Sequence, residues 1–185
     1  VEKPKPAPAR DRTLNQDELK RLFRACEKCY KFHNLRAIVE VIYLTMSRRG
    51  EVLDLKRTDV DYMHRVAVLR ETKDNQSSTG KDRKIGLSPR VVELLQAQPE
   101  SVSGIYFPIR SISAFEKAFK RAVKRADITD FHMHDLRHCR ATDLVEIHGW
   151  NTVELMQQGG WTSAAMVKRY ANISPRHLAR KLKQG

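Results

Sequence analysis

The segment from residue 38 to residue 46 limits the possible folds of this chain more than any other. It contains Ile38, Val39, Val41, Ile42, Leu44 and Met46. At a helical repeat these apolar side chains cover most sides of the helix rather than one stripe, and such a helix is buried by its neighbours. We therefore expect a helical domain built around this segment, with Asn34 as a possible cap.

Other segments have the spacing of helices that bury a single face. Apolar residues recur at helical intervals from Leu19 to Tyr30, after the capping-box spacings Thr13/Gln16 and Asn15/Glu18. This predicts a helix over 15–31. Further helices are expected over 51–55, 89–97, 112–123, 134–147, 151–158, 163–171 and 174–183, with breaks at Gly149, at Gly159-Gly160 and before Pro175.

Two short runs have β character. Residues 66–69 and 84–87 flank the polar, glycine-containing loop 74–82, which predicts a hairpin, and 105–107 is a candidate for one more strand. The expected fold class is mainly α with a small antiparallel β-sheet or hairpin. A length of 185 residues fits one such domain, with or without a tail.

The charge of the chain indicates its partner. Lys and Arg number 35 against 22 Asp and Glu, a net charge of +13. A positive field of this size favours DNA or RNA over an anionic membrane surface, since no strongly apolar helix face accompanies it. The sequence has no apolar stretch long enough to span a bilayer. An odd number of cysteines, Cys26, Cys29 and Cys139, favours a reducing compartment. We expect a cytoplasmic, nucleoid-associated protein.

Three weaker motifs have ordinary explanations. Cys26 and Cys29 with His33 lack a fourth zinc ligand, and Cys26 lies on an apolar helical stripe. His134 and His138 could face one metal, but the intervening residues do not form a metalloprotease motif. Residues 151–170 are compatible with a helix-turn-helix, although the motif at 159–170 described below accounts for more of their polar side chains. We expect no metal and no cofactor.

Four segments in chain order carry the strongest signal. They are TMSRRGEVLDL at 45–55, ETKDNQSSTGKDRKIGLS at 71–88, HDLRH at 134–138 and GGWTSAAMVKRY at 159–170. The first resembles the Arg box of tyrosine site-specific recombinases, the third resembles their H-D-L-R-H box, and in the fourth Trp161 stands nine residues before Tyr170. Over about residues 13–175 the chain is similar to the catalytic domain of these enzymes, of the kind found in phage and prophage integrases.

The chemistry of a DNA phosphodiester accounts for the two arginines of these boxes. Attack on phosphorus concentrates charge on two non-bridging oxygens, and guanidinium groups are permanently charged and match that geometry. The resemblance assigns this role to Arg48 and Arg137. Arg48 is preferred to its neighbour Arg49 because it occupies the family position. Glu51 would orient Arg48 as a supporting carboxylate.

The resemblance makes Tyr170 the nucleophile, which leaves a 3′-phosphotyrosine and a free 5′-hydroxyl. Because an incoming DNA hydroxyl splits this ester, rejoining requires neither ATP nor a metal. A phenol with a pKa near 10 needs a proton acceptor, for which His134 is the candidate, with phosphate contact as an additional role. A structural histidine at 134 and a core tyrosine at 170 are the alternatives.

A lysine in the family's hairpin protonates the departing 5′-oxygen. Lys73, directly after the first strand, matches it best, and Lys81 and Lys84 are the alternatives. Trp161 replaces the histidine more usual at its position. Its indole can donate one hydrogen bond to a phosphate oxygen or pack the nucleophile segment, but it cannot shuttle protons.

The resemblance implies a tyrosine recombinase catalytic-domain fold over 13–173, preceded by a flexible linker, 1–12, and followed by a C-terminal tail helix, 174–185. It also implies site-specific recombination of double-stranded DNA, as in integration or excision of phage or other mobile DNA, by a homotetramer. A monomer is compatible with the free domain, and the resemblance also implies an N-terminal core-binding domain that is missing from these 185 residues. The alternatives are a type IB topoisomerase or telomere resolvase, and a catalytically idle DNA-binding protein.

Overall fold

The structure is a computed structural model that describes residues 12–70 and 82–170. Lys73, Lys81, the expected linker up to residue 11 and the expected tail helix lie outside the described residues. Within the described ranges the chain is mostly helical with one small antiparallel sheet, as the sequence predicts. No helix in these ranges is long and apolar enough to cross a bilayer.

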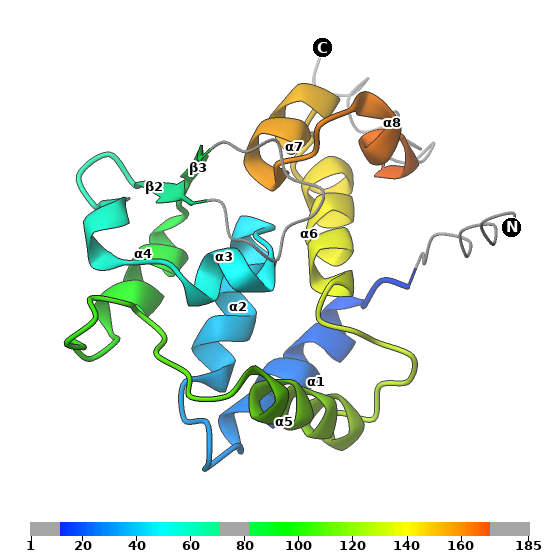
Figure 1. Cartoon of the computed structure of the whole chain (residues 1–185). Helices are drawn as coiled ribbons and strands as arrows, with labels where there is room; N and C mark the ends of the chain where they lie inside the picture. Colours follow the sequence, from blue (N-terminus) through cyan, green and yellow to red (C-terminus); the bar gives the residue numbers. More distant parts are fainter. Residues whose placement is uncertain (1–11, 71–81, 171–185) are drawn as a thin grey trace, which may run out of the picture.

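Helix α2 (Leu35–Thr45) is buried along nearly its whole length, as expected, and lies in the middle of the molecule (Figure 1). Helix α1 (Gln16–Glu27) packs against it and begins with a capping box formed by Asn15 and Glu18. It ends earlier than predicted. The N–H of Cys29 bonds to the carbonyl of Cys26, so the chain turns towards α2.

The sheet has strand order β1-β2-β3, from β1 (Val60–Asp61), β2 (Val66–Leu69) and β3 (Arg83–Gly86). Strands β2 and β3 are antiparallel, with Leu69 opposite Arg83, which confirms the hairpin pairing. The strand expected over 105–107 is wrong. Only Ile105 forms a bridge, to Lys56, because Tyr106 and Phe107 are instead buried as core side chains.

The remaining elements lie around α2 and the sheet. They are α3 (Arg49–Leu53), η1 (Arg57–Asp59), α4 (Pro89–Gln96), α5 (Ile112–Arg125), α6 (Asp135–Glu146), α7 (Thr152–Gly159), α8 (Ala164–Val167) and η2 (Lys168–Tyr170). The helix expected over 163–171 is divided into α8 and the 3₁₀ turn η2. Figure 1 shows α7 and α8 beside one end of α6, away from α1 and α5.

Two hydrophobic clusters hold these elements together. The main core takes side chains from α1 to α5, the sheet and the first turns of α6. The smaller cluster lies where α6, α7, α8 and η2 meet the end of α2, and contains Met46, Ala141, Leu144, Val145, Leu155, Trp161, Val167 and Tyr170. Helix α6 contributes to both clusters, so the segments that carry the sequence motifs meet beside it.

Candidate active site

Arg137 is a buried charge at the start of α6, with 2% of its surface exposed. One terminal nitrogen donates to the carbonyl of Met46 and the other donates to the carbonyl of Gly159 at 2.8 Å. The guanidinium carbon lies 4.9 Å from the centre of the Trp161 ring. Its Nε has no hydrogen-bond partner among the described residues. These contacts fix the guanidinium in one position.

Arg48 is the residue that precedes α3, and Glu51 holds it at two points. The backbone N–H of Arg48 donates to Glu51 Oε2 at 2.6 Å, and its guanidinium donates to Oε1 at 3.2 Å. A second guanidinium nitrogen lies 3.5 Å from the carbonyl of Gly160. Arg49 instead forms an ion pair with Glu116 on α5. The fold thus brings Arg48, and not Arg49, towards the segment that leads to Tyr170.

A third arginine, which the sequence did not single out, belongs to the same group. Arg83 begins β3 and donates to both oxygens of Glu51, from Nε at 3.3 Å and from a terminal nitrogen at 2.8 Å. Its other terminal nitrogen donates to the carbonyl of Gln158 at 2.5 Å. In the sequence it is one basic residue among several in KDRK, with no motif of its own.

The electrostatics of this group favour an anion. The charges of Arg48, Arg83 and Arg137 act together on the carboxylate of Glu51. Burial alone would raise the pKa of Glu51, but Arg83 and the N–H of Arg48 outweigh it and hold that pKa below its usual range. Burial lowers the pKa of Arg137 to about 9, which still leaves the guanidinium charged at neutral pH. A phosphate would compensate the excess positive charge.

Tyr170 ends η2 and is 7% exposed. Its hydroxyl contacts Nδ1 of His138. The ring centroids of Tyr170 and Trp161 lie 5.6 Å apart, and those of Tyr170 and His138 lie 5.7 Å apart. The phenol ring therefore belongs to the smaller hydrophobic cluster, while its oxygen faces a group that can accept a proton.

The histidine against the phenol differs from the one expected. The sequence pattern made His134 the candidate proton acceptor and considered His138 only as part of the HDLRH segment and as the second half of a possible metal-binding pair. The structure places the ring of His138, partly buried one helical turn further along α6, at the hydroxyl of Tyr170. His134 is exposed, and its ring meets that of His138 edge-on at 5.1 Å. Both residues have the i, i+4 spacing of one helix face, so spacing alone does not choose between them.

Trp161 is buried against the end of α7. A Cβ added at Gly159 would collide with the Trp161 ring, so the indole fits there only because residue 159 is glycine. The Trp161 ring also contacts Arg137 and Tyr170. These contacts support the packing role for Trp161, and its position beside Arg137 is compatible with the phosphate contact.

Lys84 is the alternative proton donor that can be located. It lies on β3 next to Arg83, and successive side chains of a strand point to opposite faces. Arg83 reaches Glu51, whereas Lys84 is exposed. The structure therefore disfavours Lys84, and Lys73 and Lys81 lie outside the described residues.

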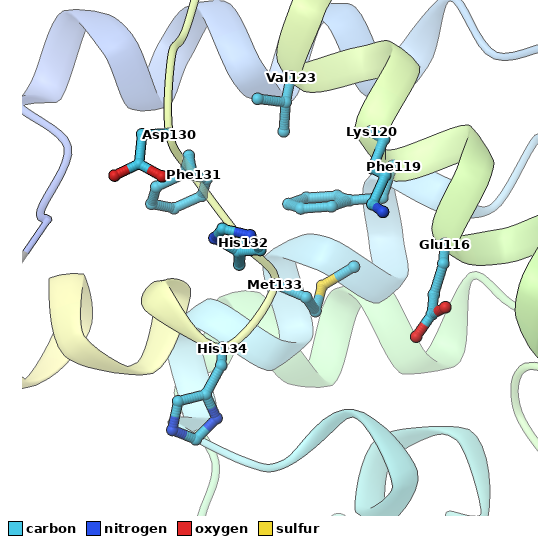
Figure 2. Close-up of a pocket in the computed structure, with 9 residues that line it drawn as sticks. All are labelled: Glu116, Phe119, Lys120, Val123, Asp130, Phe131, His132, Met133 and His134. Carbon is cyan, nitrogen blue, oxygen red and sulfur yellow. The ribbon is translucent and has the colours of Figure 1, made fainter. Parts of the chain in front are cut away.

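A pocket of about 540 Å³ lies between α5 and the segment before α6 (Figure 2). Figure 2 shows Phe119 and Phe131 facing each other across it, with His134 at one end. Glu116 and Asp130 also line it. Lys120 and His132 line it as well, so its charges are mixed, and its apolar walls and two carboxylates make it a poorer phosphate site than the arginine group.

Metal ligands are not clustered in the described part of the chain, where no group of three or more His, Cys, Asp or Glu could hold an ion. Cys26, Cys29 and Cys139 are buried free thiols. Burial raises the pKa of Cys26 to about 12 and that of Cys139 to about 11. Their environment is that of small core side chains.

Comparison with known proteins decides the family. The sequence model of the phage integrase family matches residues 12–177. The chain belongs to this family. It is 35% identical over 182 residues to the shufflon-specific DNA recombinase of Escherichia coli, an alignment that covers 98% of this chain and 45% of that protein. It is 29% identical to the integrase of Salmonella phage P22, covering 100% of this chain and 49% of the relative.

The chain thus spans less than half the length of these two relatives. Among solved structures, the catalytic domain of bacteriophage HP1 integrase is 26% identical, with a TM-score of 0.70 over 92% of this chain and 93% of that one. The expected tyrosine recombinase catalytic-domain fold is confirmed, and so is the family resemblance in the sequence.

Proposed function

We propose that this chain cleaves and rejoins double-stranded DNA at specific sites, as the catalytic part of an integrase or recombinase. One observation carries this function: the hydroxyl of Tyr170 faces a histidine nitrogen while its ring packs on Trp161, which lies over a buried arginine. A nucleophile, a proton acceptor and a phosphate-binding cation are therefore adjacent.

In the proposed cleavage step the Tyr170 oxygen attacks phosphorus and its proton passes to His138. The bond between phosphorus and the 5′-oxygen breaks, and that oxygen takes a proton from Lys73. The products are a 3′-phosphotyrosine and a free 5′-hydroxyl. Rejoining is the same reaction in reverse, with the 5′-hydroxyl of another strand as the nucleophile, so the energy of the phosphodiester is retained.

Arg48 and Arg137 would bind the two non-bridging oxygens, where charge accumulates in the transition state. Several contacts support this role, because both guanidinium groups are held by protein carbonyls and by Glu51 before any DNA is bound. Groups oriented in advance need no rearrangement as charge develops. The exposed His134 can add a phosphate contact from the start of α6.

The wider assembly is part of the same proposal. A net charge of +13 supports DNA as the partner and predicts binding that weakens steeply with salt. We propose a homotetramer on DNA, an additional core-binding domain preceding residues 1–12, a tail helix over 174–185, and action in the bacterial cytoplasm at the nucleoid.

The experiment is a covalent trap. The substrate is a pool of duplexes with randomised sequence around a nick. After cleavage, the short fragment that carries the new 5′-hydroxyl dissociates, so rejoining is prevented and the protein remains attached to the DNA. Wild type should form a denaturation-resistant adduct that peptide mapping assigns to Tyr170. Tyr170→Phe should form none, and Tyr62→Phe should match wild type, because the Tyr62 hydroxyl pairs with Tyr106 at 2.5 Å.

Other outcomes identify the alternatives. An adduct on another tyrosine overturns the assignment of Tyr170. Salt-sensitive binding without any adduct indicates an idle DNA-binding protein. Relaxation of supercoiled plasmid without recombinant products indicates a topoisomerase.

The proton donor needs its own test, with a substrate whose 5′-bridging oxygen is sulfur. A thiolate leaves without protonation, so Lys73→Ala should cleave this substrate nearly as fast as wild type and ordinary DNA slowly. Arg48→Ala should stay slow on both. Rescue of Lys81→Ala with no rescue of Lys73→Ala would assign the role to Lys81.

A further inference from the structure

Three consecutive carbonyls at the end of α7 each accept a hydrogen bond from a different arginine. Arg83 donates to Gln158 at 2.5 Å, Arg137 to Gly159 at 2.8 Å and Arg48 to Gly160 at 3.5 Å. The three arginines come from β3, α6 and the residue before α3. Segments that are distant in the sequence therefore meet at one helix end.

The physical chemistry of a helix end explains why arginines gather there. The last carbonyls of a helix lack partners within the helix and carry the negative end of its dipole. Gly160 takes a left-handed conformation, with φ 70°, directly after α7. A Cβ at this residue would lie 2.6 Å from Nε of Arg83. The end of α7 is thus shaped for close approach of Arg83.

Arg83 differs from the other two arginines because every one of its guanidinium nitrogens already donates to a protein oxygen. Its side chain is 15% exposed. Two of these bonds reach the two oxygens of Glu51, the carboxylate that holds Arg48 through the backbone and the side chain. Arg83 therefore has the geometry of a support for Arg48 rather than of a phosphate ligand.

Gln158 locks the same strand to the same helix. Its side-chain oxygen accepts the N–H of Gly86 at 3.0 Å, and its nitrogen donates to the carbonyl of Gly86 at 3.0 Å. The amide thus pairs with β3 as a neighbouring strand would. Because Gln158 also receives Arg83 on its own carbonyl, β3 and α7 cannot shift relative to each other without breaking both sets of bonds.

We infer that Arg83 is a positioning residue of the recombination reaction, which fixes Arg48 for phosphate binding through Glu51 and the end of α7. This inference rests on the proposed function, since Arg48 has a phosphate to bind only if DNA is cleaved. Removal of Arg83 leaves Glu51 free to move and Arg48 without its oriented carboxylate. We expect Arg83→Ala to slow cleavage about 10- to 100-fold, the usual range for a lost supporting contact.

The first test is a double-mutant cycle on the nicked duplex pool, with Arg70→Ala as the matched control. Arg70 follows β2 at the base of the same hairpin and pairs with Asp59 and Asp82, so its removal changes the charge equally. Arg83→Ala should lower the cleavage rate of the wild-type protein but should lower that of the Arg48→Ala variant little further. Arg70→Ala should have little effect on the cleavage rate. Independent, additive effects of Arg83→Ala and Arg48→Ala would overturn the inference.

A neutral substrate separates positioning from general loss of folding. Replacement of one non-bridging oxygen by a methyl group removes the phosphate charge that Arg48 compensates. On this methylphosphonate the defect of Arg83→Ala should largely disappear, as should that of Arg48→Ala. An equal defect on both substrates would show that Arg83 only supports folding.

One glycine variant displaces Arg83 without removing it, and a second glycine variant is its matched control. Gly160→Ala places a Cβ against Arg83, whereas Gly104→Ala has the same positive φ of 70° and nothing within 4 Å of its Cβ. Both should lose similar stability from backbone strain. Only Gly160→Ala should slow cleavage, and equal cleavage rates for the two variants would count against the inference.

A measurement without DNA keeps the inference separate from the proposed function. NMR of ¹⁵N-labelled arginine side chains should show restricted motion of the Arg48 guanidinium in wild type and Arg70→Ala, and faster motion in Arg83→Ala. Unchanged motion in Arg83→Ala overturns the inference even if DNA is cleaved. If wild type forms no DNA adduct, the proposed function fails while the motion of Arg48 still decides the role of Arg83.

Discussion

The main core and the smaller cluster beside α6 use apolar side chains for different purposes. In the main core, rings such as Phe107 and Phe115 are fully buried among other apolar groups. In the smaller cluster, the rings of Trp161 and Tyr170 contact each other while one lies over Arg137 and the other presents its hydroxyl to His138. Packing in the first region sets stability, and packing in the second also places the Tyr170 hydroxyl beside His138.

The smaller cluster holds the proposed nucleophile without a dedicated strand or long helix. Tyr170 lies on a 3₁₀ turn after a short helix, elements that are marginal by themselves. Burial of the aromatic ring supplies the restraint that secondary structure does not. We therefore expect changes in the smaller cluster to affect cleavage more than stability, and changes in the main core to do the reverse.

The largest effect should come from the main core. Phe115→Ala removes a fully buried ring and should lower the free energy of unfolding by about 3–5 kcal/mol, measured by denaturant titration. Molecules that remain folded should cleave DNA at the wild-type rate. The exposed Val153 is the control, since Val153→Ala should change stability by less than about 0.5 kcal/mol. A loss of cleavage in folded Phe115→Ala would break the separation of the two regions.

The next effect concerns the proton acceptor. His138→Asn should slow cleavage at least about 100-fold, because it removes the group against the Tyr170 hydroxyl. His134→Asn should slow it less, since that ring contacts His138 at 5.1 Å and is exposed. If His134→Asn slowed cleavage more than His138→Asn, His134 would be the proton acceptor.

A smaller effect is expected at Trp161. Trp161→Ala should slow cleavage about tenfold or more, because the Tyr170 ring loses a packing surface and moves. Trp161→His should retain substantial cleavage, since it keeps a flat ring with an N–H. Cleavage by the alanine variant at the wild-type rate would remove Trp161 from the site. Circular dichroism of both variants checks that the fold is intact.

The smallest effect is a pH dependence of stability that both regions share. Burial would raise the pKa of Glu40, but its hydrogen bonds with Arg90 and Arg36 hold that pKa below its usual range, as Arg83 does for Glu51. As the pH falls, these two carboxylates therefore take up protons in the unfolded chain before they do so in the folded chain. The stabilisation is complete above the unfolded pKa of about 4.3 and is lost as the pH falls through the lower folded pKa.

Glu40→Gln and Glu51→Gln should each weaken the loss of unfolding free energy on acidification, measured by chemical denaturation at a series of pH values. Only Glu51→Gln should also slow cleavage at neutral pH, because Glu40 joins α2 to α4 whereas Glu51 holds Arg48. A wild-type pH slope in Glu51→Gln would contradict the assigned charge state of this carboxylate.

The sequence by itself determined the features that depend on local spacing. The buried helix α2 and the β2–β3 pairing follow from short-range patterns, and the structure contains both. A capping box before the first helix was also predicted, and of its two possible spacings the structure forms the one of Asn15 and Glu18. The order of the recombinase segments was likewise sufficient to identify the family. Hydrophobic period and capping are properties of neighbouring residues, so a single sequence carries them.

Tertiary structure alone decided which side chains meet. His134 and His138 share one helix face, and only the return of η2 to α6 selects His138 for Tyr170. Arg83 reaches Glu51 and Gln158 because the end of α7 packs against β3, far away in the sequence. Strand β1 has two residues, too few for any alternation to show. Such contacts depend on how distant elements pack, and the spacing of neighbouring residues does not encode that geometry.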